Sequence, residues 1–222
     1  MKNESRGPVG DEKYAEYIEQ IRDDSSHMLA IVDDLLTMSQ LDGGVGATDE
    51  QPTGVDETIC AAVRTVLPDN GAGGGGIILQ VESDLPLLRV GEHDLRKMLH
   101  NLMDTALRSR RRGEDDPVTV AARLEYRGEL VISVSDTGIG MAGSDIDMAL
   151  SRFGRVDNGD GDAVPGVGLG LPLIKALAKR YDAPLEIHSE RGVGTIVSLR
   201  FPVDQILTGT VEESDGKAEA AA

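Results

Sequence analysis

Residues 130–141 read LVISVSDTGIGM, an apolar strand that ends in an aspartate followed by two glycines. A carboxylate at this place, Asp136, can accept a hydrogen bond from an exocyclic amine on a flat heterocycle. Gly138 and Gly140 remove side chains where the backbone has to turn or approach a ligand closely. Taken alone, an Asp-Thr-Gly sequence is more often an ordinary turn, so its meaning depends on the patterns around it.

A second glycine cluster lies at residues 165–176, PGVGLGLPLIKA, where Gly166, Gly168 and Gly170 lead into an apolar helix. A glycine-rich loop that ends at a helix N-terminus is a natural seat for phosphate. The spacing differs from the Rossmann fingerprint, and no P-loop lysine follows. By itself the cluster is a weak signal.

The third pattern precedes both, on a helix expected over residues 92–110. Four polar residues at i, i+3, i+4 and i+7 share one face of it, namely Asn101, Asp104, Thr105 and Arg108. Oxygen ligands beside a cation suit a Mg²⁺-bound polyphosphate, although a polar helical face is usually just solvated. The three patterns together predict a nucleotide pocket, with adenine at one end and phosphates at the other.

The whole composition is that of a globular protein and excludes several functions. The chain has 222 residues and a net charge of −17, which argues against sequence-independent binding to nucleic acid and against docking on an anionic membrane. No apolar run reaches the roughly 20 residues of a membrane span, and the first ten residues do not resemble a signal peptide. The single cysteine, Cys60, suits a reducing, cytoplasmic location.

The order of elements predicts an α+β fold. A heptad-like apolar stripe indicates one long coiled-coil-like helix over residues 11–41. After it we expect a two-layer sandwich of a mixed, mostly antiparallel sheet with helices on one face. A hairpin is predicted at Arg127-Gly128. We divide the chain into a helical segment 1–43, a linker 44–54, a domain 55–203 and a disordered acidic tail 204–222.

These motifs resemble the ATP-binding domain of sensor histidine kinases, which has the Bergerat-type fold shared with gyrase, heat-shock chaperone and mismatch-repair ATPases. HNLMDTALRSR (100–110) resembles the N box, DTGIGM (136–141) the G1 box, SRFGRVDN (151–158) the F box and GVGLGLPLIKAL (166–177) the G2 box. Residues 7–43 resemble the dimerisation and phosphotransfer hairpin, mainly its second helix. The resemblance therefore covers about nine tenths of the chain.

The resemblance implies a role for individual residues. Asp136 would bind the adenine amine, helped by Thr195 through water, and Gly138 and Gly140 would shape the adenine end. The glycines of the G2 box would form the hinge of an ATP lid over about residues 154–167, anchored by Phe153. Asn101 and Thr105 would lie near the phosphates and Mg²⁺. The complete set implied to bind ATP is Asn101, Thr105, Arg108, Asp136, Gly138, Ile139, Gly140, Met141, Phe153, Gly166, Val167, Gly168, Leu169, Gly170, Leu171 and Thr195.

The chain departs from the family pattern at four points. Thr105 stands where the N box has a second asparagine, a Mg²⁺ ligand, and Ser109 replaces a tyrosine. The expected lid, residues 154–166, contains one arginine and three aspartates, which neutralise phosphate poorly. The family's phosphorylated histidine belongs on a first hairpin helix, and none of His27, His93, His100 and His188 resembles it. We therefore expect a shortened form of a longer sensor kinase, inactive alone.

Two functions follow as alternatives. In the first, the chain binds ATP with Mg²⁺ and presents the γ-phosphoryl group to a hairpin histidine, for relay to a response-regulator aspartate, within a homodimer formed through the hairpin. In the second, the domain is a degenerate module that binds nucleotide weakly or not at all and acts through protein contacts. Thr105 and the acidic lid favour the second, and the intact glycine motifs favour the first. A stand-alone gyrase-type ATPase would need a transducer domain that the sequence lacks.

Overall fold

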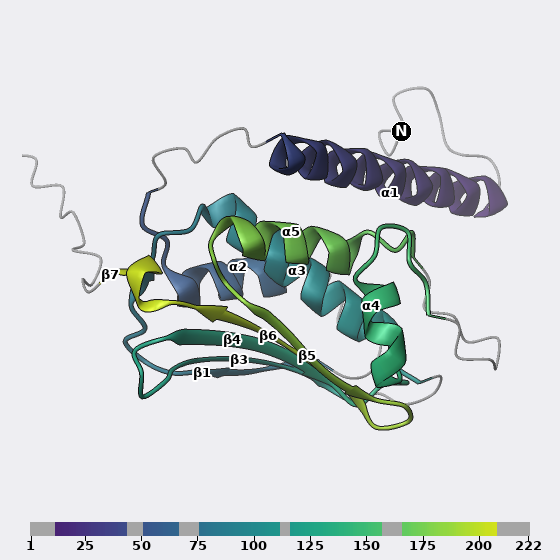
Figure 1. Ribbon diagram of the computed structural model, residues 1–222. Helices are drawn as coiled ribbons and strands as arrows, with labels where there is room; N and C mark the ends of the chain where they lie inside the picture. Colours follow the sequence, from purple (N-terminus) through teal and green to yellow (C-terminus); the bar gives the residue numbers. More distant parts are fainter. Residues whose placement is uncertain (1–11, 44–50, 67–75, 112–115, 157–165, 208–222) are drawn as a thin grey trace, which may run out of the picture. The chain divides into compact units, whose positions relative to one another are not determined.

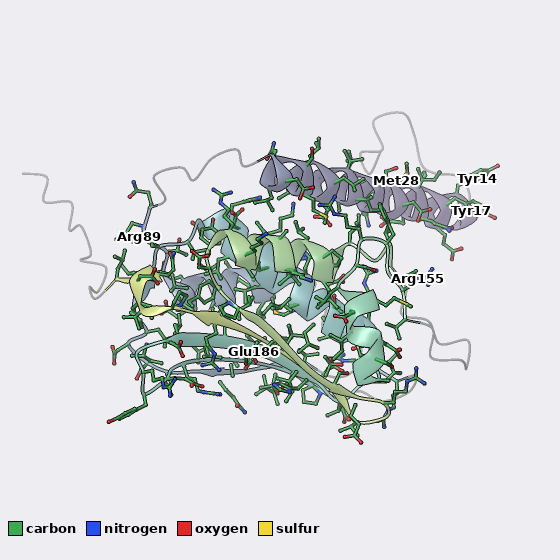
Figure 2. The ribbon with its side chains drawn as sticks, viewed as in Figure 1. Tyr14, Tyr17, Met28, Arg89, Arg155 and Glu186 are labelled. Atoms are coloured by element: carbon green, nitrogen blue, oxygen red, sulfur yellow. The ribbon has the colours of Figure 1, made fainter. Side chains whose placement is uncertain are left out.

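The computed structural model describes residues 12–43, 51–66, 76–111, 116–156 and 166–207. The chain divides into two compact units, Met1–Val45 and Gly46–Ala222. The described part of the first unit is one helix, α1 (Glu12–Asp42), as its heptad stripe predicts. Several large apolar side chains on α1 are exposed, among them Tyr14, Tyr17 and Met28, which are labelled in Figure 2.

The second unit is a two-layer α+β sandwich (Figure 1). Its principal helices are α2 (Val55–Val66), α3 (Glu92–Arg108), α4 (Ile146–Ala149) and α5 (Gly170–Arg180), and two short 3₁₀ turns cover Gly143–Asp145 and Val203–Gln205. The strands are β1 (Ile77–Val81), β2 (Leu87–Leu88), β3 (Val118–Leu124), β4 (Leu130–Asp136), β5 (Leu185–Glu190), β6 (Gly194–Phe201) and β7 (Ile206–Leu207). Figure 1 shows α2, α3 and α5 over one face of the sheet.

The main sheet has five strands in the order β1-β3-β4-β6-β5. Only β1 and β3 are parallel; the other neighbours are antiparallel, and β3 and β4 form the predicted hairpin around Arg127-Gly128. Alternate residues point toward the helices. Ile132 on β4 lies opposite Leu199 on β6, and both are fully buried. This core holds the end of β4, where Asp136 lies, firmly against the helical layer.

The structure corrects the expected start of the C-terminal tail. The sequence predicts a disordered tail from residue 204, yet Ile206 and Leu207 form β7, which pairs with Leu88 and Leu87 of β2. Ile206 and Leu207 are apolar and can pair as a short strand. The acidic residues around them make the whole segment look like a disordered tail in the sequence. Residues 208–222 lie outside the described residues.

Thr53, which the sequence places in the linker, also belongs to this small sheet. It bridges Leu88 from the side opposite β7, and its hydroxyl donates a hydrogen bond to the Val90 carbonyl at 2.5 Å. Thr53 is buried, and Gly54 precedes the first turn of α2. The chain is therefore fixed to the second unit two residues before α2 begins.

Candidate nucleotide-binding site

Asp136 lies at the last position of β4, directly opposite Thr195 on β6. Both side chains consequently point to the helical side of the sheet. Asp136 is half-buried, and the Gly138 N–H donates a hydrogen bond to its Oδ1 at 2.8 Å. Burial raises the pKa of this carboxyl above its ordinary value, while hydrogen bonds from Gly138, the Ser109 side chain and the Thr195 backbone oppose that rise. A partly dehydrated carboxylate at the end of a strand is suited to accept a hydrogen bond from the amine of a base.

The loop after Asp136 is packed so closely that two of its residues have to be glycine. A Cβ on Gly138 would lie 2.2 Å from the Ser109 carbonyl oxygen. Gly140 has φ +59°, and a Cβ there would lie 2.0 Å from the Glu190 carbonyl oxygen. The Ile139 N–H donates to the Ser109 carbonyl at 2.9 Å, which ties the loop to the end of α3. The base end of the site is therefore preformed by backbone rather than by bulky side chains.

Ser189 on β5 is the residue that sequence reasoning missed. Its Oγ accepts a hydrogen bond from the Met141 N–H at 2.9 Å and lies 2.8 Å from Thr195 Oγ1. It also donates to the Gly194 carbonyl at 3.1 Å. The available signal was the alternation in LEIHSE (185–190), which places Ser189 on the same face as Leu185 and Ile187. A serine on an apolar face at the end of a strand is a candidate for such a role.

The phosphate end of the predicted site forms where α3 meets the start of α5, two helices that lie side by side (Figure 1). A Cβ on Gly170 would lie 3.3 Å from Asn101 Oδ1 and 3.5 Å from Thr105 Oγ1. Both α3 side chains thus face the first residue of α5. Asn101 Nδ2 donates a hydrogen bond to the Lys97 carbonyl at 3.0 Å. Asn101 Oδ1 therefore points away from that carbonyl and can act as an acceptor. The N-terminus of α5 has no side-chain cap, so it suits an anion.

Other predicted residues lie around these two ends. Phe153 has φ +61° and its N–H donates to the Gly168 carbonyl at 3.0 Å, so the two flanks of the expected lid are joined by backbone. Arg108 pairs with Asp104 at 2.9 Å rather than extending alone. Leu169 and Leu171 are buried, Val167 and Met141 are half-buried, and Gly166 is exposed. Most of the expected lid, residues 157–165, lies outside the described residues.

The donor set fits a hard cation that is shared with phosphates. Asn101 Oδ1 and Thr105 Oγ1 are neutral oxygens, the ligand type that Mg²⁺ accepts when phosphate and water complete its shell. In the described part of the chain no three His, Cys, Asp or Glu side chains gather into a site that could hold a metal alone. The residues therefore fit a metal that arrives with its nucleotide.

None of the described helices is long and apolar enough to cross a membrane.

Comparisons with known proteins identify the family to which the chain belongs. The family described as "Histidine kinase-, DNA gyrase B-, and HSP90-like ATPase" matches residues 91–205. The "Non-motile and phage-resistance protein" of Caulobacter vibrioides is 33% identical over 213 residues, which cover 94% of this chain and 25% of that protein. The "Cell-division control histidine kinase PdhS" of Brucella suis is 30% identical, over 93% of this chain and 21% of the relative. The chain thus spans about a quarter or less of these curated relatives.

Solved structures share the fold. The structure of full-length ShkA in complex with AMPPNP superposes with a TM-score of 0.68 at 24% identity, covering 86% of this chain and 39% of that one. The histidine kinase AdeS of Acinetobacter baumannii gives a TM-score of 0.64 at 15% identity and covers 89% of this chain and 87% of its own.

Proposed function

The chain belongs to the histidine kinase-, DNA gyrase B- and HSP90-like ATPase family, and on that premise we propose that it is the ATP-binding catalytic portion of a two-component sensor histidine kinase. The observation that supports this most is the pairing of Asp136 with Thr195 at the end of the sheet, beside a loop shaped by Gly138 and Gly140. That arrangement presents hydrogen-bond acceptors to a flat base.

The base and the phosphates would be held by different elements. Asp136 accepts from the adenine amine, while its backbone neighbours keep the carboxylate in place. The uncapped N-terminus of α5 receives the phosphates, next to Asn101 and Thr105. These two residues would hold Mg²⁺, which supplies charge neutralisation on the phosphate oxygens. The site would thereby orient the γ-phosphoryl group toward a histidine outside these 222 residues, from which a response-regulator aspartate would receive it.

The α1 helix would supply the dimer contact of this kinase. Ile21, Met28 and Leu35 recur every seven residues, and all three are exposed. An exposed apolar stripe of this period is typical of a helix that packs on a second helix. The cytoplasmic location expected from the sequence is part of the same proposal.

Thr105 favours a second candidate, a regulatory module with weak or metal-independent nucleotide binding. A threonine hydroxyl is shorter and a poorer Mg²⁺ donor than an asparagine carbonyl. Gly170 leaves space beside Thr105, since even a Cβ there would lie 3.5 Å from its Oγ1. The substitution Thr105→Asn consequently tests this candidate directly.

Calorimetric titration with ATP and ADP, each with and without Mg²⁺, separates the two functions. The kinase proposal expects micromolar to submillimolar binding that strengthens with Mg²⁺, and loss of binding in Asp136→Asn with an unchanged circular dichroism spectrum. The exposed Asp147→Asn is the matched control and should bind as the wild type does. Tight binding that ignores Mg²⁺, and that gains a Mg²⁺ dependence in Thr105→Asn, would identify the regulatory module. No binding at millimolar nucleotide would overturn the kinase proposal.

A further inference from the structure

Ser189 makes more polar contacts than any role in the β5–β6 ladder requires. Its side chain stands beside that of Thr195, the residue opposite it in the register, with 2.8 Å between the two hydroxyl oxygens. Two further contacts belong to the same oxygen: the Met141 N–H at 2.9 Å and the Gly194 carbonyl at 3.1 Å. The serine therefore joins the loop after Asp136 to the strand that carries Thr195.

The direction of each hydrogen bond follows from what the groups can do. A hydroxyl has one proton to donate and two lone pairs that accept. The Gly194 carbonyl can only accept, so the Ser189 proton belongs to that bond. The Met141 N–H can only donate, so it uses one Ser189 lone pair. The contact with Thr195 then has to use the second lone pair, which makes Thr195 the donor. All three hydrogen-bonding positions of Ser189 are filled in this arrangement.

The consequence appears on the side of Thr195 that faces the base. With its proton committed to Ser189, the Thr195 hydroxyl offers only lone pairs in other directions. Asp136, directly opposite, is an acceptor as well. Two acceptors side by side favour a 6-amino group and its hydrogens, and they repel a 6-carbonyl oxygen, directly or through a bridging water.

We propose that Ser189 is a specificity-determining positioning residue that fixes the Thr195 hydroxyl as an acceptor and so selects adenine over 6-oxopurine nucleotides. This inference rests on the proposed ATP site and deepens it. Without the Ser189 hydroxyl, the Thr195 O–H rotates freely and can donate toward a 6-carbonyl. Asp136 still discriminates, so preference for adenine falls without vanishing.

The test compares the dissociation constants of ADP and inosine diphosphate, two nucleotides that differ at purine position 6 and in the proton that hypoxanthine carries on N1. Wild-type chain should prefer ADP by at least tenfold. Ser189→Ala should reduce the ratio of the two constants about two- to fivefold, the value of one net hydrogen bond. Loss of the Met141 contact weakens both nucleotides together and cancels in the ratio. Ser198→Ala is the matched control, because Ser198 lies on the opposite face of β6 and should leave the ratio unchanged.

Three outcomes overturn the inference. A wild-type ratio near one does so without any variant, even if Ser189→Ala fails to fold. An unchanged ratio in a folded Ser189→Ala gives serine a purely structural role. A conservative Ser189→Thr, which keeps the hydroxyl, should restore the ratio; a ratio that stays at the alanine value contradicts the hydrogen-bond assignment. If the wild type binds neither nucleotide, the proposed ATP site itself fails, which is a distinguishable result.

Discussion

The Tyr181 hydroxyl donates a 2.7 Å hydrogen bond to Asp94 Oδ2 and thereby joins the end of α5 to the first turn of α3. Tyr181 is buried, and Arg180 adds an ion pair to the same carboxylate at 3.4 Å. The first residue of α5, Gly170, and Asn101, in the middle of α3, form the proposed phosphate end of the site. The contact therefore fixes the spacing of the helices from the far side.

Tyr181→Phe should lower the free energy of unfolding by about 1–2 kcal/mol, because it removes the hydroxyl from a largely buried polar cluster. Urea denaturation followed by circular dichroism measures the change. Tyr126→Phe is the control: Tyr126 is fully exposed, and its loss of a hydroxyl should leave stability unchanged. Equal stability of both variants would show that the Asp94 contact contributes nothing net.

Gly138→Ala should destabilise the domain by about 3 kcal/mol or more, since its Cβ would lie 2.2 Å from a backbone oxygen that cannot move without shifting α3. Gly143→Ala offers a matched control, because a Cβ at Gly143 meets nothing within 4 Å. That variant should remain within about 0.5 kcal/mol of the wild type. Thermal unfolding of both variants in parallel checks the prediction, and similar midpoints would show that the loop yields easily.

Asp136→Asn should make the unliganded protein more stable relative to the wild type as the pH rises. Burial raises the pKa of Asp136 above its ordinary value of 3.8. Between that value and the higher folded value the folded state binds more protons than the unfolded state, so wild-type stability falls with increasing pH there. The asparagine does not titrate and escapes this loss. Urea unfolding at several pH values from 4 to 7.5 measures the difference between the two proteins, and a difference that shrinks with pH would contradict the sign.

Leu29→Glu should weaken self-association of the full chain at least tenfold. Leu29 is 71% exposed and is next to Met28 of the apolar stripe on α1, so a charge placed there has to be buried in a helix-to-helix contact through that stripe. Gln20→Glu introduces the same charge at an exposed polar position of α1 and should associate as the wild type does. Sedimentation equilibrium over a range of concentrations supplies the measurement. A wild type that stays monomeric at high micromolar concentration would refute the dimer through α1.

Local patterns were sufficient for much of the fold. Alternating apolar residues on either side of Arg127-Gly128 predicted the β3–β4 hairpin, because the turn and both strands lie within one short stretch. The parallel pairing of β1 with β3 was not assigned, since it joins Ile77 to Val118 across an intervening helix. The β2–β7 pair was missed for the same reason: Leu88 and Ile206 are far apart in sequence, and a two-residue strand has no period to detect.

In the candidate site, too, residues with a local sequence signal could be predicted, and residues whose role depends on distant contacts could not. Asp136 and the glycines could be found because each stands out chemically within its own segment. Ser189 could not, because its role depends on Thr195, Met141 and Gly194 meeting at one oxygen, which only the register of β5 and β6 brings about. A contact between Arg108 and phosphate remains a prediction. In the structure Arg108 forms an ion pair with Asp104, four residues earlier on the same helix, as oppositely charged residues at this spacing commonly do.

Leu88 of β2 lies between two segments that are far apart in the sequence: the isolated bridge residue Thr53 pairs with it on one side and Ile206 of β7 on the other. Neighbouring strands are about 4.8 Å apart, so the backbone at these flanking residues is separated by only about 10 Å. A short peptide could span that gap, and the ATP-binding unit should therefore accept circular permutation, with new ends opened at an exposed turn such as Arg127-Gly128.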